Sequence, residues 1–406
     1  MPKWELLEGS LATPAGFRAS AVAAGIKKTP HALDLTLIFS DAPVTTAAGV
    51  FTSNRVAAAP VVLSRQNLAA SRGRCRAIVA NSGNANACTG QGGMRTAQET
   101  ARAAARLLRI EPTQVLVAST GVIGAPLPWG LIKKQLPTLQ RELSRANAPL
   151  AARAILTTDT HPKTCVFRSE VNGKPVHIAG VAKGAGMIQP HMATMLCFLT
   201  TDAAVRPPIL QRTLKTAVED SFNRVTVDGD TSTNDTAVVL ASGLSGVAVQ
   251  SRPDSRAWFL EGMTLACQTL ARMIAGDGEG ASRLVTVEVL GGRTPSDANL
   301  VARAVANSPL VKTALAGADP NWGRILCAAG YSGATFDPNR TDVFVNDLCL
   351  CRKGLDAGFD EATAHSELDR KEVTIRVNLH AGKARARLWT CDLTQEYITI
   401  NASYRT

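Results

Sequence analysis

A lysine, a glycine-rich turn and a threonine that opens an apolar run are the residues of this sequence best suited to chemistry. The stretch reads Lys183-Gly-Ala-Gly-Met-Ile-Gln-Pro-His-Met-Ala-Thr-Met-Leu-Cys-Phe-Leu-Thr-Thr-Asp202, and its apolar part begins at Thr194. A loop that leads directly into a buried strand can hold a nucleophile, because the strand fixes its position. The same pattern is also typical of an ordinary glycine turn before a strand with a threonine at its edge. The stretch alone leaves both interpretations open.

Length and composition predict an α/β enzyme with a large core. The chain has 406 residues, of which 45% are hydrophobic and only 4% aromatic, which is enough for two or three domains. The nine cysteines are dispersed, odd in number and without a CxxC pair, so we expect reduced thiols in a cytoplasmic protein. The sequence shows neither an 18-residue apolar run nor a signal-peptide pattern, so we expect no membrane span and no leader.

Charge and ligand patterns narrow the possible partners. The net charge is +11, but the basic residues are scattered and few aromatic residues lie among them, so we do not expect nucleic-acid binding. Attraction of anionic small molecules, or a solvated surface, fits better. The oxygen-rich stretch 227–236 superficially resembles a calcium loop but lacks the closing glutamate. We therefore expect no metal, and a loop satisfied by its own Asp and Thr side chains.

Strands and polar loops alternate in the first half of the chain. Arg76–Ala80 reads as a buried strand that leads into the Asn- and Gly-rich loop 81–90 and then into an amphipathic helix. Gln114–Ala118 reads as a second buried strand, which ends at Ser119-Thr120-Gly121. This order is typical of a layered α/β domain with a site at the strand ends.

Other segments predict further elements. Ala59–Leu63 is a strand candidate, and Asn172-Gly173 predicts a hairpin over residues 166–178. A long helix is expected over about 254–275, where it stops at Gly276-Asp-Gly-Glu-Gly280, and another over 296–307. Residues from about 285 to 392 are expected to form a smaller α+β domain, and the tail 397–406 has strand character.

Some ten short motifs, taken together in their order along the chain, resemble those of the ornithine acetyltransferase (glutamate N-acetyltransferase) family of arginine biosynthesis. The resemblance covers essentially the whole chain. Each motif alone is weak, but some ten of them in the right order are specific. They are Gly25–Lys28, Ala48–Arg55, Asn81–Gly90, Ser119–Gly124, Leu156–Thr160, Lys183–Asp202, Asp228–Asp235, Gly276–Ala281, Asp319–Arg324 and the end of the chain from Ile400-Asn401 to Thr406.

The resemblance implies a layered α/β/β/α core of the N-terminal-nucleophile type with a smaller C-terminal α+β domain. It implies that the precursor cuts itself between Ala193 and Thr194, which gives an α chain, 1–193, and a β chain, 194–406, assembled as α2β2. A threonine hydroxyl is a weak nucleophile and needs a base. The freed α-amine, with an unperturbed pKa near ~8, would be that base.

The resemblance also assigns site residues. It places the oxyanion of the tetrahedral intermediate at Thr120 and Gly121, and a substrate carboxylate at Lys183. Glu279 would face the distal amine of ornithine. Thr157, Asn401 and Thr406 would complete the pocket, with Thr158 as the alternative to its neighbour Thr157.

The implied reaction has two half-reactions and uses no cofactor. Thr194 would take the acetyl group from N2-acetyl-L-ornithine, and L-glutamate would then accept it in the same pocket. Acetyl-CoA is a possible second donor. The alternative from another class is an amidohydrolase or aminopeptidase, in which water rather than glutamate resolves the acyl-enzyme.

Overall fold

The computed structural model describes residues 2–189 and 195–403, so Ala193, Thr194 and Thr406 lie outside the described residues. The chain divides into two compact units. The first unit holds the chain up to Asn223 together with Asp230–Leu270, and the second holds Arg224–Gly229 and the chain from Ala271 to Arg405. Each unit is described by itself below. Across the described ranges, no helix combines the length and apolar character needed to cross a bilayer.

Two sheets form the centre of the first unit. A six-stranded sheet has the order β1 (Glu5–Leu7), β7 (Lys163–Val171), β8 (Lys174–Lys183), β9 (Leu196–Thr201), β10 (Thr236–Ala241) and β4 (Thr46–Phe51). A four-stranded sheet has the order β2 (Phe17–Val22), β3 (Leu35–Ser40), β5 (Ala77–Asn81) and β6 (Val115–Ser119). The helices of this unit are α1 (Ala59–Ala70), α2 (Gly90–Leu108), α3 (Trp129–Arg141), α4 (Leu150–Ala154), α5 (Pro207–Glu219) and α6 (Pro253–Gly276), the last of which continues into the second unit.

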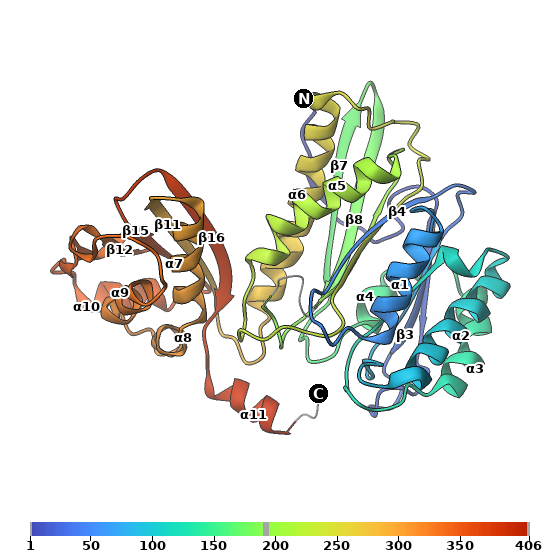
Figure 1. Cartoon of the computed structure of the whole chain (residues 1–406), viewed down its shortest axis with the longest axis horizontal. Helices are drawn as coiled ribbons and strands as arrows, with labels where there is room; N and C mark the ends of the chain where they lie inside the picture. The colour runs from blue at the N-terminus through green and yellow to red at the C-terminus, as the bar shows by residue number, and fades with distance from the viewer. Residues whose placement is uncertain (1, 190–194, 404–406) are drawn as a thin grey trace. The chain divides into compact units, whose positions relative to one another are not determined.

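Side-chain alternation along the strands makes the layers. One hydrophobic cluster joins the inner faces of the two sheets, for example Ile78 of β5 with Phe198 of β9. The opposite face of the four-stranded sheet, which includes Val79, packs against α2 and α3. On the outer side of the six-stranded sheet, the amide of Gln211 in α5 exchanges hydrogen bonds with Gly49 of β4 at 3.0–3.2 Å. The predicted α/β/β/α layering is therefore confirmed (Figure 1).

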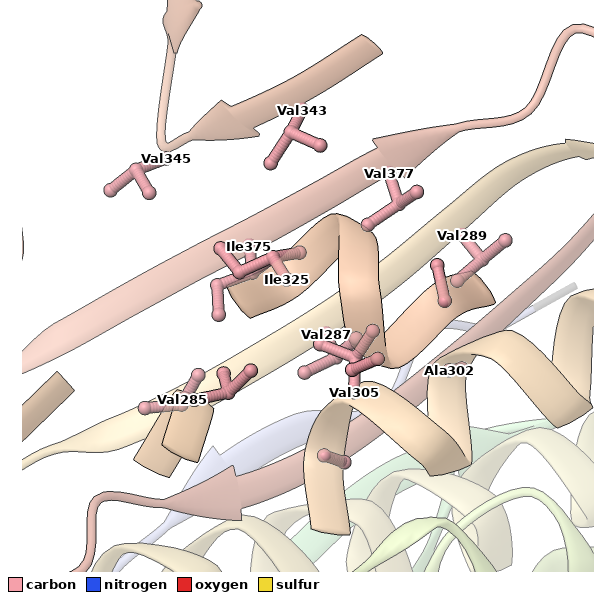
Figure 2. Packing of buried hydrophobic residues seen from close by; sticks show 14 of the residues in the cluster. Val285, Val287, Val289, Ala302, Val305, Ile325, Val343, Val345, Ile375 and Val377 are labelled. Atoms are coloured by element: carbon pink, nitrogen blue, oxygen red, sulfur yellow. The ribbon is translucent and has the colours of Figure 1, made fainter. Parts of the chain in front are cut away.

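The second unit is a smaller α+β body around one sheet. The sheet order is β14 (Leu355–Asp356), β13 (Leu348–Arg352), β12 (Asp342–Val345), β15 (Glu372–Asn378), β11 (Leu284–Gly292) and β16 (Ala384–Cys391). Its helices are α7 (Pro295–Asn307), α8 (Pro309–Ala316), α9 (Trp322–Gly330), α10 (Glu361–Leu368) and α11 (Gln395–Ser403). Figure 2 shows the core, where valines of β11 and β12 meet Ile375 of β15, Val305 of α7 and Ile325 of α9.

Several local predictions are confirmed. Asn172 and Gly173 have φ values of 51° and 74°, as a two-residue type I′ turn requires, and they join β7 to β8 in the predicted hairpin. The long helix α6 and the helix α7 occupy the expected residues. The side chain of Thr294 caps the start of α7, where its Oγ1 accepts the N–H of Asp297 at 3.1 Å.

The strand prediction for Ala59–Leu63 is wrong, because these residues begin helix α1. Pro60 fits the first helical turn, where no N–H donor is needed. The helix then covers the edge strand β6: Ser64 Oγ bonds to both the N–H and the C=O of Val117, and Asn67 Nδ2 donates to the C=O of Val115. Burying that edge removes the unpaired strand groups that would otherwise invite another strand.

The strand character predicted for the tail is also wrong. The described tail residues form helix α11, Gln395–Ser403. Thr394 Oγ1 accepts the N–H of Glu396 at 3.2 Å, which satisfies one of the donors left open at a helix start. A local cap therefore outweighs the β-propensity of Tyr397-Ile-Thr-Ile400.

We predict that Ile375→Ala destabilises the protein by roughly 2–5 kcal/mol, because it leaves a cavity in the centre of the second core. Denaturant unfolding would measure the change. Leu355→Ala removes a comparable side chain that is 71% exposed, and it should change the free energy of unfolding by less than about 0.5 kcal/mol. Equal effects of the two substitutions would contradict the described core.

Candidate functional site

The register of three strands gathers candidate residues at one end of the six-stranded sheet. Lys183 ends β8 opposite Leu196, which begins β9. Leu196 in turn lies opposite Thr236, the first residue of β10. The N–H of Thr236 also donates to the C=O of Met195 at 3.0 Å. The strand that follows Thr194 in the chain therefore begins beside Lys183.

Two polar loops of the four-stranded sheet are joined side by side. The parallel strands β5 and β6 end at Asn81 and Ser119, which lie opposite each other. Ser119 Oγ donates to Asn81 Oδ1 at 2.6 Å, and the N–H of Thr120 donates to the C=O of Asn81 at 3.0 Å. The Asn- and Gly-rich loop predicted from the sequence is thus an ordered support for the turn at Thr120.

Only glycine fits at position 121. Gly121 has φ 126°, a conformation that side chains rarely adopt. A Cβ there would lie 2.4 Å from the backbone carbon of Gly83 and 2.6 Å from the nitrogen of Asn84. The close approach of these two backbones fixes the direction of the peptide that follows Thr120.

The oxygen-rich loop before β10 contacts both the turn at Thr120 and the residue that precedes β9. Asn234 Nδ2 donates to the C=O of Ser119 at 2.8 Å and to that of Ala85 at 2.6 Å. Next to it, Asp235 Oδ1 accepts the N–H of Met195 at 2.7 Å. This loop therefore connects the turn at Thr120 with the start of β9. The residues that the structure describes contain no group of three or more His, Cys, Asp and Glu side chains arranged to hold a metal ion.

Lys183 is buried and points into this polar cluster. Its Nζ donates to Thr120 Oγ1 at 3.4 Å and lies 4.0 Å from Asp159 Oδ2. Lys163, which is also buried, makes the shorter ion pair with Asp159 Oδ1 at 2.7 Å. Two buried ammonium groups therefore lie around the carboxylate of Asp159.

Asp159 also accepts backbone hydrogen bonds, in addition to its contacts with the two lysines. It accepts the N–H of Gly184 at 2.7 Å and the N–H of Thr157 at 3.1 Å. Burial alone would raise the pKa of Asp159, but the ammonium groups of Lys183 and Lys163 and these hydrogen bonds hold it at about 2. The sequence prediction singled out Thr157 and Lys183 but missed Asp159. Its position in Leu156-Thr-Thr-Asp-Thr160, a motif already singled out, was the available signal.

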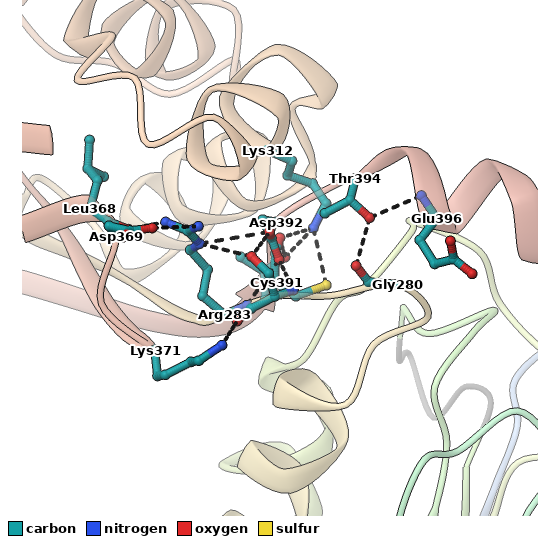
Figure 3. Close-up of polar contacts among 12 residues, drawn as sticks. Gly280, Arg283, Lys312, Leu368, Asp369, Lys371, Cys391, Asp392, Thr394 and Glu396 are labelled. Carbon is teal, nitrogen blue, oxygen red and sulfur yellow. Dashed lines mark hydrogen bonds and ion pairs between the residues drawn. The ribbon is translucent and has the colours of Figure 1, made fainter. Parts of the chain in front are cut away.

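Glu279 and Asn401 meet in the second unit. Asn401 Nδ2 donates to Glu279 Oε2 at 2.7 Å. Gly280, with φ 69°, must be glycine, because a Cβ would lie 2.6 Å from the nitrogen of Tyr397. Thr394 Oγ1 donates to the C=O of Gly280 at 2.7 Å and so ties the Gly-rich loop to the start of α11 (Figure 3). The 2.7 Å contact joins two residues that the sequence prediction assigned to one pocket.

Polar contacts at the end of β16 hold the same Gly-rich segment. Asp392 accepts the N–H of Ser282 at 2.8 Å and that of Arg283 at 3.2 Å. The guanidinium of Arg283 donates to the C=O of Leu368, and Lys312 Nζ donates to the C=O of Cys391 (Figure 3). The segment that follows Glu279 is thus fastened within the second unit.

The predicted site residues fall into two groups of contacts. In the first unit Thr157 and Lys183 contact Asp159, and Lys183 contacts Thr120, which precedes Gly121; in the second unit Glu279 and Asn401 pair. Ala193, Thr194 and Thr406 lie outside the described residues, so the predicted cleavage between Ala193 and Thr194 stays a prediction.

Comparisons with known proteins cover nearly the whole chain. The family model described as ArgJ family matches residues 18–406. The arginine biosynthesis bifunctional protein ArgJ of Dehalococcoides mccartyi is 48% identical over 403 residues, covering 99% of this chain and 98% of that protein. The protein of the same name from Symbiobacterium thermophilum is 50% identical over 405 residues, covering 99% and 100%. A crystal structure of arginine biosynthesis bifunctional protein argJ from Bacillus halodurans is 45% identical, covers 51% of this chain and 98% of that chain, and has a TM-score of 0.49.

The ion cluster predicts a dependence of stability on pH. The folded pKa of Asp159, about 2, lies below the usual 3.8, so its contribution is present above pH 4 and is lost as the pH falls toward 2. That contribution is on the order of 2 kcal/mol. Denaturant unfolding of Asp159→Asn should show a smaller decline over this pH range than the unsubstituted protein shows.

A double variant separates the effect of losing the Asp159 charge from a general loss of stability. Asp159→Asn removes the carboxylate that Lys163 contacts at 2.7 Å and should cost roughly 3–5 kcal/mol at neutral pH. The double variant Asp159→Asn/Lys163→Met removes both members of the 2.7 Å pair and should recover part of that loss. A pH profile of Asp159→Asn that matches the unsubstituted protein would contradict the assignment.

Proposed function

The chain belongs to the ArgJ family, and from that premise we propose that it is a self-cleaving acetyltransferase of arginine biosynthesis. It moves the acetyl group of N2-acetyl-L-ornithine to L-glutamate through an ester on Thr194. The family match over residues 18–406 carries the proposal. The contacts of Lys183, Thr120 and Asp159 support it, because they place a buried polar cluster beside β9, the strand that begins at Leu196.

The first step of the proposal frees the nucleophile. Thr194 Oγ attacks the carbonyl carbon of Ala193, the peptide nitrogen leaves as the α-amine of Thr194, and water hydrolyses the resulting ester. The chain then consists of residues 1–193 and 194–406. The new amine accepts the hydroxyl proton when Thr194 attacks an acetyl donor, so no histidine is needed as a base.

Residues of the first unit are proposed to bind the carboxylate and the oxyanion. Lys183 binds the substrate carboxylate, since it is a buried ammonium group held in place by Asp159. Thr120 and Gly121 stabilise the oxyanion of the tetrahedral intermediate, a role typically worth 100- to 1000-fold in rate for one donor. The backbone at Gly121 supports this role, because Gly83 and Asn84 hold it in a conformation open only to glycine. Thr157 completes this side of the pocket.

Residues of the second unit are proposed to recognise the distal amine of ornithine. Glu279 supplies the carboxylate and Asn401 holds it, which their 2.7 Å hydrogen bond supports. Thr406 completes the pocket. The Gly-rich loop is fastened by Thr394 and Asp392, and a rigid loop is what the positioning of a single carboxylate requires.

The second half-reaction returns the enzyme to its starting state. Ornithine leaves, L-glutamate enters the same pocket, and its amine attacks the acetyl-Thr194 ester. Acetyl-CoA serves as a further donor in this proposal, which agrees with the word bifunctional in the relatives' names. No other cofactor takes part. The proposal also includes assembly of the cleaved chains as α2β2 in the cytoplasm.

Self-cleavage is the first test. A denaturing gel of the purified protein should show two chains of about half the full mass, and N-terminal sequencing of one should begin at Thr194. Thr194→Ala should remain one intact chain and transfer no acetyl group, because it lacks the hydroxyl for both reactions. An unsubstituted protein that stays intact yet transfers acetyl groups would rule out this mechanism.

Carboxylate binding is tested by a matched pair of substrates. Lys183→Met should raise KM for N2-acetyl-L-ornithine roughly 10- to 100-fold, as expected when a charged hydrogen bond is lost. N-acetylputrescine has the same structure without the carboxylate, and the substitution should leave its weak use nearly unchanged. Steady-state kinetics with both compounds would measure this, and an equal loss for the two would refute the assigned role of Lys183.

A further inference from the structure

A cavity in the first unit lies at the end of the six-stranded sheet that is opposite to the candidate site. Its volume is about 570 Å³, which falls within the ~300–1,000 Å³ typical of small-molecule pockets. Thr46 at the start of β4 and Ala241 at the end of β10 line the cavity and pair with each other. Lys183 and Thr236 mark the other end of the sheet, so the length of β10, roughly 17 Å, separates the two places. No step proposed above uses this cavity.

We propose that this cavity binds a small organic phosphate, a phosphate monoester whose charged group is held by the guanidinium groups of Arg74 and Arg206. Both arginines line the cavity. The inference does not depend on the proposed function, because none of the residues to which that proposal gives a role lines the cavity. It gives the first unit a second ligand site.

The fold brings the two arginines to one place although they are distant in the chain. Arg74 follows Gly73 in the turn after α1, and Arg206 precedes Pro207, the first residue of α5. A Cβ at Gly73 would lie 3.0 Å from the Cβ of Pro207, so these two segments are in contact. The C=O of Gly73 also accepts the N–H of Ala47 in β4 at 2.7 Å. The turn that carries Arg74 is therefore held against both the sheet and the start of α5.

Positive charge predominates around the cavity. In the part of the chain that the structure describes, no aspartate or glutamate is among the residues that line it. Arg206 donates to the hydroxyl of Ser251, which also lines the cavity but carries no charge. Asp41, an acid near this end of the sheet, pairs with Arg18 instead. A phosphate monoester carries about −1.5 to −2 charges at neutral pH, which matches two guanidinium groups, and the planar fork of arginine suits phosphate oxygens.

Apolar side chains of the cavity account for the organic part of the ligand. Val44, which is 59% exposed, lines the cavity together with the buried Val205 and Val249. Backbone hydrogen bonds join the segments behind it: the N–H of Val249 donates to the C=O of Ala204 at 2.9 Å, and the N–H of Ala204 donates to the C=O of Val247 at 2.9 Å. The wall is therefore preformed, as small-molecule sites usually are. An apolar ester group covers surface at Val44 that inorganic phosphate leaves in water.

Titration calorimetry of the full chain with three small probes tests the inference. Phenyl phosphate carries both the phosphate and an apolar ring, inorganic phosphate lacks the ring, and benzoate has the ring with a single-charged carboxylate. We expect phenyl phosphate to bind more tightly than either of the other two, because it alone combines two charges with apolar surface. Affinity for benzoate equal to that for phenyl phosphate would contradict a phosphate site. Affinity for inorganic phosphate equal to that for phenyl phosphate would contradict an organic ligand.

Two double variants with the same loss of charge locate the binding. Arg74→Gln/Arg206→Gln should weaken the binding of phenyl phosphate roughly 10- to 100-fold, because charged hydrogen bonds are lost. Arg72→Gln/Arg252→Gln removes two neighbouring exposed arginines that are not among the lining residues, and it should bind phenyl phosphate as the unsubstituted protein does. Lys183→Met should also keep this affinity, since Lys183 lies at the other end of the sheet.

Each further outcome overturns the inference. Equal losses in the two double variants would mean attraction by the net charge of +11 alone. Loss of binding in Lys183→Met would place the phosphate at the candidate site, and no binding of phenyl phosphate at millimolar concentration would mean that the cavity takes no such ligand. Should Arg74→Gln/Arg206→Gln not fold, Arg74→Gln alone keeps the contact between Arg206 and Ser251, and it is compared with Arg72→Gln under the same criteria.

Discussion

The hydrogen-bond register of β8, β9 and β10 is the constraint on which the rest of the site depends. It sets Lys183, Leu196 and Thr236 opposite one another at one end of the sheet. A shift of one residue would turn every side chain of β9 to the other face, so the inner cluster around Phe198 holds the register firmly. The Asn172-Gly173 turn fixes β8 against β7 in the same way. The residues proposed to act at the start of β9 are therefore positioned by a core that lies outside the proposed site.

Buried charge at this sheet end is costly, and its partners explain how the fold tolerates it. Lys163 and Lys183 are buried near one carboxylate, Asp159, whose pKa they depress to about 2. Asp235 lies in the same region with its pKa raised by burial. Groups whose pKa values are pushed in opposite directions are typical of sites that bind charge or transfer protons. Hydrogen bonds from the backbone of Gly184 and Met195 hold the two acids in place.

Local sequence patterns predicted the helices and strands correctly where a turn motif or the periodicity of hydrophobic residues determines them. The hairpin at Asn172-Gly173, the helix α6 and the alternation of layers follow from such signals. The strand expected at Ala59–Leu63 failed because contacts of Ser64 and Asn67 with the edge of β6 select a helix, and sequence spacing does not show that edge. Asp159 was missed for the same reason. Its partner Lys183 is distant in the chain, and only the folded sheet brings the two together. By contrast, the family resemblance assigned Thr120 and Lys183 to the site, and the structure shows these two side chains in contact.

The central claim is that Thr194 carries the acetyl group between two amino acids, and mass spectrometry of the enzyme tests it most directly. The protein is mixed with N2-acetyl-L-ornithine, quenched in acid within seconds, digested and mapped, with and without L-glutamate. The account predicts one acetyl group on the peptide that begins at Thr194, and its disappearance with formation of N-acetylglutamate when glutamate is added. Acetyl transfer at full rate with no acetylated peptide, or with the acetyl group on another residue, would contradict it.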